Sequence, residues 1–149
     1  MAEIFSKYNV DFERIRRKNI PVISCIPVEE ICKNYNFEEG LTVDLGLELS
    51  LTLKEISIDK RYDSVQKVLD NIFSNLNSNN LMVVNIDILF NPSYKLNVLK
   101  YFINLARTKM VLVQWPGEIK GNVLQYSQIN YADYVKYDLK DYGIACIKW

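Results

Sequence analysis

The chain contains no histidine, only three cysteines and only five glycines among its 149 residues. The absence of histidine excludes Ser-His and Cys-His catalysis, zinc held by imidazole and acid–base chemistry by an imidazole ring. The cysteines Cys25, Cys32 and Cys146 are odd in number, and their spacing does not match a metal cluster. We therefore interpret them as structural thiols of a reducing compartment and expect no metal and no cofactor.

The chain also lacks an excess of either charge and a long hydrophobic run. Eighteen basic and eighteen acidic residues cancel to a net charge of zero, which gives no global reason to expect nucleic acid or an anionic membrane as partner. The longest apolar runs have the length of a strand, so no membrane span is expected. Residues 1–10 mix charged and apolar residues and lack the continuous apolar core of a signal peptide. We expect a cytoplasmic protein.

A phosphate-binding loop of the form G-x-x-x-x-G-K-[ST] is also missing. Such a loop needs glycines so that backbone amides can close around phosphate, and it needs a lysine and a hydroxyl for the phosphates and magnesium. The first junction between a strand and a helix, residues 24–33, contains no glycine, loses one amide donor at Pro27 and carries Glu29 and Glu30. Conventional nucleotide binding is therefore not expected there.

Strands and helices are predicted to alternate along the chain. Short apolar runs predict strands at 20–25, 41–45, 81–86, 109–114 and 143–149. Helical spacing or position predicts helices at 11–19, 28–34, 46–56, 62–76 and 93–107, with polar turns at 38–40 and 75–80. This alternation predicts a single α/β domain over 1–149, with a mainly parallel sheet, helices on both faces and an N-terminal helical lead-in at 1–19.

The leucine-rich segment 41–53 is compatible with two structures. Its leucines and Val43 alternate strictly, which is the period of a half-buried strand, but thirteen residues would be a long strand. Leu45, Leu49 and Leu53 also form a helical stripe. We predict a strand that breaks near Gly46 and continues as a helix.

Two charged residues are candidates for chemistry, each with a plainer alternative. Asp87 follows a predicted strand and could hold magnesium or orient water, or it could cap a turn together with Asn91. Arg107 could act as an arginine finger, or it could complement the dipole at the end of its helix. We favour the structural roles for both.

Several aromatic and basic residues are candidates for recognition. Trp115 and Gly117 belong to a Trp-Pro-Gly turn that forms either a recognition loop or a packed turn. Tyr126 and Tyr134 lie in a tyrosine-rich stretch whose interleaved aspartates oppose phosphate, which favours protein contacts or packing over stacking on nucleotides. The one dense basic cluster forms a solvated helix face or a contact for DNA or an acidic partner; it consists of Arg14, Arg16, Arg17 and Lys18.

Five blocks of sequence together resemble BrxF, the family of small P-loop-type proteins from type 3 bacteriophage-exclusion (BREX) defence systems. The blocks occur in the same order and span most of the chain: 43–53 followed by Arg61, 85–90, 105–107, 114–117 and 124–134. The resemblance implies a three-layer, RecA-like core and a helix at 46–56. It also implies a role in excluding phage, beside larger partners that modify and translocate DNA.

The chain departs from that family at the residues that would bind and hydrolyse nucleotide. By the resemblance, the glycine-lysine-threonine positions of the phosphate loop fall on Glu30, Ile31 and Cys32. The strand aspartate falls on Val84, and the following glutamate becomes Asp87. Tyr131 stands where the family pattern leads us to expect a histidine. Nucleotide hydrolysis is therefore not carried over to this chain.

The sequence leads to one main hypothesis and two alternatives. The main hypothesis is a non-catalytic, RecA-like subunit that acts by protein contact in a phage-defence complex, either as a monomer or as a homo-oligomer. The alternatives are an atypical nucleotide-binding protein of the same system and a small DNA-binding adaptor. For the main hypothesis, we expect the turn at 87–92, Arg107 and the Trp115–Gly117 turn to gather at one edge of the sheet as a docking face.

Overall fold

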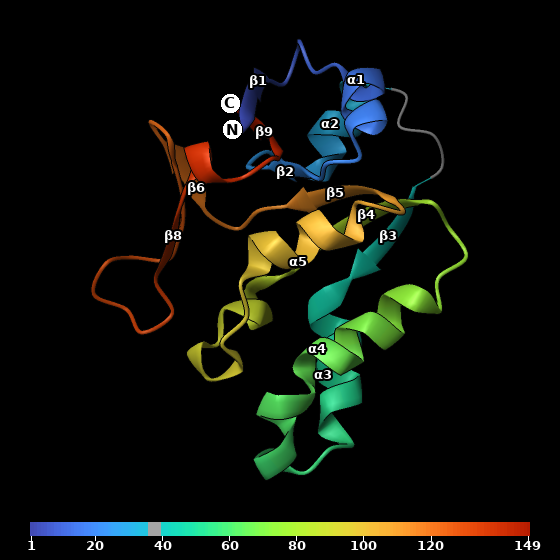
Figure 1. Cartoon of the computed structure of the whole chain (residues 1–149), viewed down its shortest axis with the longest axis vertical. Coiled ribbons are helices and arrows are strands. Elements are labelled where there is room, and N and C mark those ends of the chain that lie inside the picture. Colours follow the sequence, from blue (N-terminus) through green and yellow to red (C-terminus); the bar gives the residue numbers. More distant parts are fainter. Residues whose placement is uncertain (36–39) are drawn as a thin grey trace.

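The computed structural model describes residues 1–35 and 40–149, and its centre is a six-stranded sheet (Figure 1). Every neighbouring pair of strands in this sheet is parallel. From one edge to the other the strands are β1 (Glu3–Ser6), β9 (Ala145–Lys148), β2 (Val22–Ser24), β5 (Met110–Gln114), β4 (Asn80–Val84) and β3 (Leu41–Asp44). These pairs confirm the predicted, mainly parallel sheet. Parallel neighbours cannot be joined by a tight hairpin, so the chain returns to each strand through a crossover connection.

Helices cover both faces of this sheet. Figure 1 shows α1 (Phe12–Lys18) and α2 (Val28–Asn34) on one side, with α3 (Leu45–Lys54), α4 (Ile58–Ser74) and α5 (Val98–Leu105) on the other. Alternate residues of the strands enter two separate cores. Val22 and Leu112 pack with α1 and α2, whereas Ile23 and Val113 pack with α3, α4 and α5. The α/β class with helices on both faces is therefore confirmed.

The leucine-rich segment forms a strand followed by a helix, as predicted. β3 ends at Asp44, whose carboxylate accepts the Leu47 N–H at 3.1 Å and so caps the start of α3. Leu45, Leu49 and Leu53 are buried in the core, and the intervening leucines of α3 are exposed. The helical stripe prevails over the alternation because it places three leucines in one core, while the cap satisfies an amide at the helix terminus.

The other predicted strands and helices are present; α2 has the predicted ends, and the ends of the others differ. α4 begins at Ile58, earlier than predicted, and α5 begins only at Val98. Ser93 and Tyr94, which were expected to start this helix, instead belong to the 3₁₀ turn η2 (Pro92–Tyr94), which follows another 3₁₀ turn, η1 (Asp87–Phe90). Lys95 then adopts a left-handed conformation with a φ of 52°, which ends η2, and Asn97 caps α5 by accepting the Lys100 N–H.

Four strands were not predicted from the sequence. β1 lies within the N-terminal lead-in, which is therefore helical only at α1, and it pairs with β9 from the other end of the chain. The other three form an antiparallel sheet beside the main one: β6 (Glu118–Lys120), β7 (Val123–Tyr126) and β8 (Val135–Asp138). The 3₁₀ turn η3 (Leu139–Asp141) leads from β8 toward β9.

The remaining expectations concern the cysteines, a turn and the membrane. Cys146 is buried and Cys25 partly buried, which fits structural thiols, whereas Cys32 is exposed; all three are free. The turn expected at 38–40 falls mostly outside the described residues. Within the described part of the chain, no helix combines the length and the apolar character needed to cross a membrane.

Candidate functional site

The junction between β2 and α2 is where a P-loop protein would hold phosphate, and here its amides have partners within the chain. The Cys25 N–H donates to the Ile147 carbonyl at 2.9 Å, and the Ile26 N–H donates to the Ser24 Oγ at 3.1 Å. Ser24 is fully buried, and its hydroxyl donates in turn to the Ile26 carbonyl at 2.6 Å. The amides of Cys25 and Ile26 are therefore both bonded to oxygens of the chain, and we call this junction closed.

The first turn of α2 is capped by a side chain from the neighbouring strand. Gln114, the last residue of β5, accepts the Val28 N–H through its Oε1 at 2.9 Å. The N-cap residue Pro27 has no N–H to offer, and Glu29 and Glu30 add negative charge in this turn. The amide oxygen of Gln114 therefore bonds a donor that a phosphate oxygen would use at such a terminus. No local sequence pattern indicates this role for Gln114, because it is 86 positions away from Val28.

Arg107 does not lie near Asp87 and Trp115, so the prediction of one docking face that includes all three is wrong in this respect. α5 starts near the carboxyl end of β4 and runs back to the amino end of β5, as a crossover between parallel strands must. Arg107 follows α5 and therefore lies where the strands of the sheet begin, which we call the amino edge. Asp87 and Trp115 follow β4 and β5 and lie where the strands end, which we call the carboxyl edge. An arginine-finger role together with Asp87 has no geometric basis in this chain.

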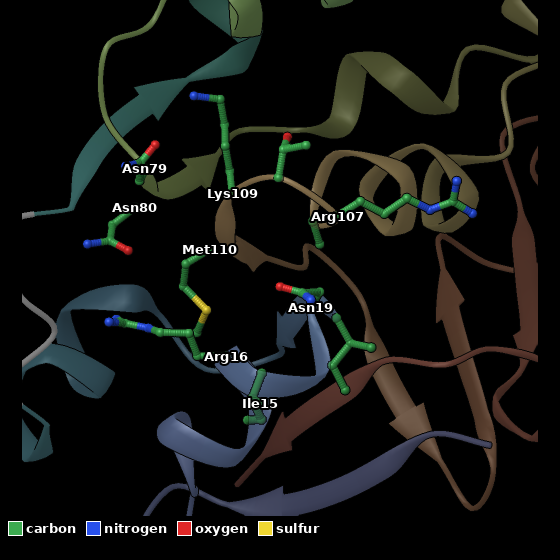
Figure 2. A pocket seen from close by; sticks show the side chains of 11 residues that line it. Ile15, Arg16, Asn19, Asn79, Asn80, Arg107, Lys109 and Met110 are labelled. Atoms are coloured by element: carbon green, nitrogen blue, oxygen red, sulfur yellow. The ribbon is translucent and has the colours of Figure 1, made fainter.

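Arg107 instead lines a pocket at the amino edge, with a volume of about 450 Å³. Three connections contribute to it: the end of α1 and the link to β2, the start of β4, and the link from α5 to β5. Figure 2 shows Arg16 and Arg107 on opposite sides of the pocket, with Asn19 and Met110 between them. No sequence pattern predicts this pocket, because its lining residues come from three segments that are far apart in the chain.

The basic cluster of α1 divides into paired and unpaired residues. Arg14 contacts the Glu3 carboxylate at 3.4 Å, and Lys18 donates a hydrogen bond to the same carboxylate. The bond from Lys18, with the charge of Arg14, lowers the pKa of Glu3. Arg16 and Arg17 are exposed and have no ion pair within residues 1–35 and 40–149. Only Arg16 of the four lines the pocket.

At the carboxyl edge, Asp87 contacts the small antiparallel sheet. Its carboxylate accepts a hydrogen bond from the Tyr126 hydroxyl at 3.3 Å, and the Tyr126 ring stacks on Phe90 with a centroid separation of 4.0 Å. Partial burial, with the negative charges of Asp87 and Asp133, raises the pKa of Tyr126 to about 12. Asp87 of η1 thus contacts the last residue of β7. The turn-capping role that we considered for Asp87 is performed by Asn91, which accepts the Ser93 N–H at 3.0 Å.

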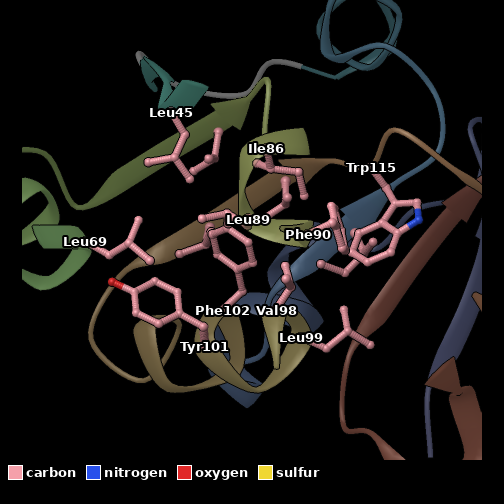
Figure 3. Packing of buried hydrophobic residues seen from close by; sticks show 14 of the residues in the cluster. Leu45, Leu69, Ile86, Leu89, Phe90, Val98, Leu99, Tyr101, Phe102 and Trp115 are labelled. Carbon is pink, nitrogen blue, oxygen red and sulfur yellow. The ribbon is translucent and has the colours of Figure 1, made fainter. Parts of the chain in front are cut away.

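Trp115 and Gly117 form a packed turn, which decides between the two alternatives for this segment. Trp115 is only 3% exposed and packs edge-on against Phe90, as Figure 3 shows. Its Nε1 donates to the Gln125 carbonyl at 2.9 Å. A Cβ on Gly117 would lie 1.8 Å from the same carbonyl oxygen, so only glycine fits there. The Trp115 side chain joins the two sheets and is not presented at the surface.

Among the candidates of the tyrosine-rich stretch, Tyr134 is half-buried and its N–H donates to the Tyr131 carbonyl at 3.1 Å. Tyr131 and Ile129 are exposed in the connection between β7 and β8. Among the described residues, no group of three or more Cys, Asp or Glu side chains is arranged to hold a metal ion. The candidates at this edge therefore offer structural contacts and a few exposed side chains.

Comparison with known proteins adds no relative: no family model, curated protein or solved structure matches this chain significantly.

Proposed function

We propose that the chain is a non-catalytic, RecA-like subunit of a BREX-type anti-phage complex, which acts in the cytoplasm through contacts with other proteins of that system. The ordered sequence blocks that resemble BrxF support the assignment. The order of the strands adds support. When β2, β3, β4, β5 and β9 are numbered one to five along the chain, their order across the sheet is five, one, four, three, two. This is the order expected of a RecA-like core.

The observation that carries the non-catalytic part is the closed junction between β2 and α2. The amides of Cys25, Ile26 and Val28 already bond to oxygens of the chain itself. A phosphate would have to displace Gln114 and the buried Ser24 hydroxyl, leaving polar groups without partners at a cost of about 1–3 kcal/mol each. The adjacent carboxylates of Glu29 and Glu30 would also repel it.

Exposed apolar side chains support a role in protein contact. α3 exposes Leu47 and Leu51, one helical turn apart, and α4 exposes Ile58 and Tyr62 with the same spacing. Such side chains lose water contact when a partner covers them, which is why grouped exposed apolar residues mark interaction surfaces. The two helices pack against one another, so both pairs belong to one helical hairpin.

The nucleotide part of the proposal is tested by NMR titration of the ¹⁵N-labelled protein with ATP and with GTP, each with magnesium. We expect the amide signals of Val28, Glu29 and Ile31 to stay in place, because the junction is filled. Micromolar binding that moves these signals and is lost in Asp87→Ala would refute the non-catalytic assignment. Absence of magnesium-dependent hydrolysis in a phosphate-release assay is the accompanying expectation.

The contact part is tested by co-expression with the other proteins of a BREX-type system and co-purification of the assembly. We expect a stable subcomplex that is weakened when Leu47 and Leu51 are both changed to serine. Lys54→Ala, an exposed polar change on the same helix, serves as the matched control. Failure of every BREX component to co-purify with the unmodified chain would contradict the proposal.

A further inference from the structure

The edge strand β3 has a neighbour on one side only among the described residues. It is the outermost strand of the main sheet and pairs with β4, from Leu41 opposite Leu81 to Asp44 opposite Val84. The backbone groups of a strand point alternately to its two sides, so some of those in β3 face away from β4. Such groups form a template on which another extended chain can pair.

The two edge strands of the main sheet differ in exposure. In β1, at the opposite side, every residue is partly buried, and the Glu3 carboxylate contacts Arg14 and Lys18 of α1. In β3, by contrast, Leu41 is 41% exposed and Thr42 is also exposed. β3 contains no lysine and no proline, which are residues that commonly prevent an edge strand from pairing. Within the described part of the chain, β3 is therefore the edge that remains open to a further strand.

A groove lies beside this edge strand. Two hollows of about 360 and 650 Å³ share Leu41, Asn75 and Leu76 in their linings, so they form one continuous depression, which we call the β3 groove. It lies between β3 and the end of α4 with the link that follows α4 (Figure 1). Ile72 and Leu76 form part of its wall, and both pack on the main core while remaining only partly buried. Apolar side chains of a ligand would gain affinity by covering these residues.

The β3 groove is acidic at the end where β3 leads into α3. Asp44 and Glu48 line it there, and among its described lining residues there is no lysine or arginine. Asp44 already accepts the Leu47 N–H, whereas Glu48 is exposed and takes part in no ion pair within residues 1–35 and 40–149. A carboxylate in this position favours a cationic side chain at the corresponding end of a bound segment.

We propose that the β3 groove binds an extended segment of a partner protein, which adds to the sheet beside β3 and carries a lysine or arginine near Glu48. Its alternate side chains are apolar and cover Leu41, Ile72 and Leu76. In this mode of binding, main-chain hydrogen bonds give affinity and pockets for alternate side chains give specificity. A second copy that paired through its own β3 would bring Leu-Thr-Val-Asp, which offers no cation to Glu48. Binding at this edge does not require membership of a BREX-type complex.

The experiment selects binders to the full chain from a displayed library of random peptides and measures the enriched sequences as synthetic peptides by calorimetry. We expect these sequences to share alternating apolar residues and a lysine or arginine at one end. Leu41→Ser should weaken binding about ten-fold and Glu48→Gln about three-fold, because an exposed charge pair contributes less than a covered apolar side chain. The matched controls are Leu47→Ser and Glu55→Gln, which change exposed residues of the same types outside the groove lining. Thermal unfolding checks that the variants remain folded.

Backbone hydrogen exchange distinguishes addition of a strand from contact by side chains alone. Amides of β3 that face away from β4 should exchange more slowly in the complex with an enriched peptide, because they become hydrogen-bonded to it. The proposal is overturned if no peptide is enriched, if the exchange of β3 does not change, or if Leu47→Ser weakens binding as much as Leu41→Ser. It is also overturned if sedimentation shows that the free chain is a dimer in which the β3 amides are already protected, since a second copy would then be the occupant.

Discussion

Replacing Gly117 by alanine should strongly destabilise the fold, because this position has no room for a Cβ. The added carbon would lie 1.8 Å from the Gln125 carbonyl oxygen and 2.8 Å from the Trp115 Nε1. These are the two atoms that bond to one another and fasten β7 to the end of β5. The hairpin of β6 and β7 would have to move away from the buried Trp115 before the methyl group could be accommodated.

The size of the effect follows from two contributions. Forced displacement of well-packed groups costs about 1–3 kcal/mol, and loss of the hydrogen bond from Trp115 adds about 0.5–1.5 kcal/mol. We therefore expect the free energy of unfolding to fall by about 2–4 kcal/mol, a large part of the 5–15 kcal/mol of a typical domain. With a urea slope of about 2 kcal/mol per molar, the midpoint falls by about 1–2 M.

The assay is equilibrium unfolding in urea, followed by circular dichroism and by tryptophan fluorescence. Gly143→Ala is the matched control, because a Cβ there meets nothing within 4 Å. Its midpoint should stay unchanged or rise slightly, since alanine restricts the unfolded chain more than glycine does. Equal midpoints for the two variants would show that the Trp-Pro-Gly turn is not packed against β7 as described.

Three further predictions concern the core, the cap and the thiols. Phe102→Ala leaves a cavity under α5 and should lower the free energy of unfolding by about 3–5 kcal/mol, measured by urea unfolding. Gln114→Ala removes the acceptor at the start of α2 and should cost about 1 kcal/mol in the same assay; an unchanged midpoint would mean that the bond is not formed in solution. Burial raises the pKa of Cys25 and of Cys146 to about 12, so both thiols stay protonated and unreactive at about pH 8, and native labelling read by mass spectrometry should modify the exposed Cys32 first. Rapid native labelling of Cys146 would contradict its place in the core.

Local pattern was sufficient for most elements of the main sheet. β2, β5 and β9 are short apolar runs in which nearly every residue is buried, so their hydrophobicity is visible in any short window, whereas β4 and the edge strand β3 are buried mainly at alternate residues. β1 and the small antiparallel sheet were missed for the opposite reason. Their burial patterns are mixed, with residues only partly buried, and they become strands because of partners far along the chain.

The contacts of the candidate site were not predictable from the sequence. The missing glycines, Pro27 and the two glutamates lead only to the expectation that the first junction does not hold phosphate. The Gln114 side chain that caps α2 is 86 positions away from Val28 in the chain, and no spacing rule connects them. The sequence did not show whether Trp115 is exposed or buried, because a Trp-Pro-Gly turn is compatible with both. The position of β7, whose Gln125 carbonyl accepts the Trp115 N–H, shows that it is buried.

By itself, the sequence determined that this chain has no histidine and no glycine-rich phosphate-binding loop, and it determined the order of the main strands and helices. Both depend on residue type and local period, which are properties of a short segment. Tertiary structure alone decided which side chains meet. It separated Arg107 from Asp87 by placing the two ends of a crossover at opposite edges of the sheet, and it placed Arg107 in the lining of one pocket with Arg16 and Lys109. The reason is that proximity in a parallel sheet is set by strand order and direction, which link residues distant along the chain.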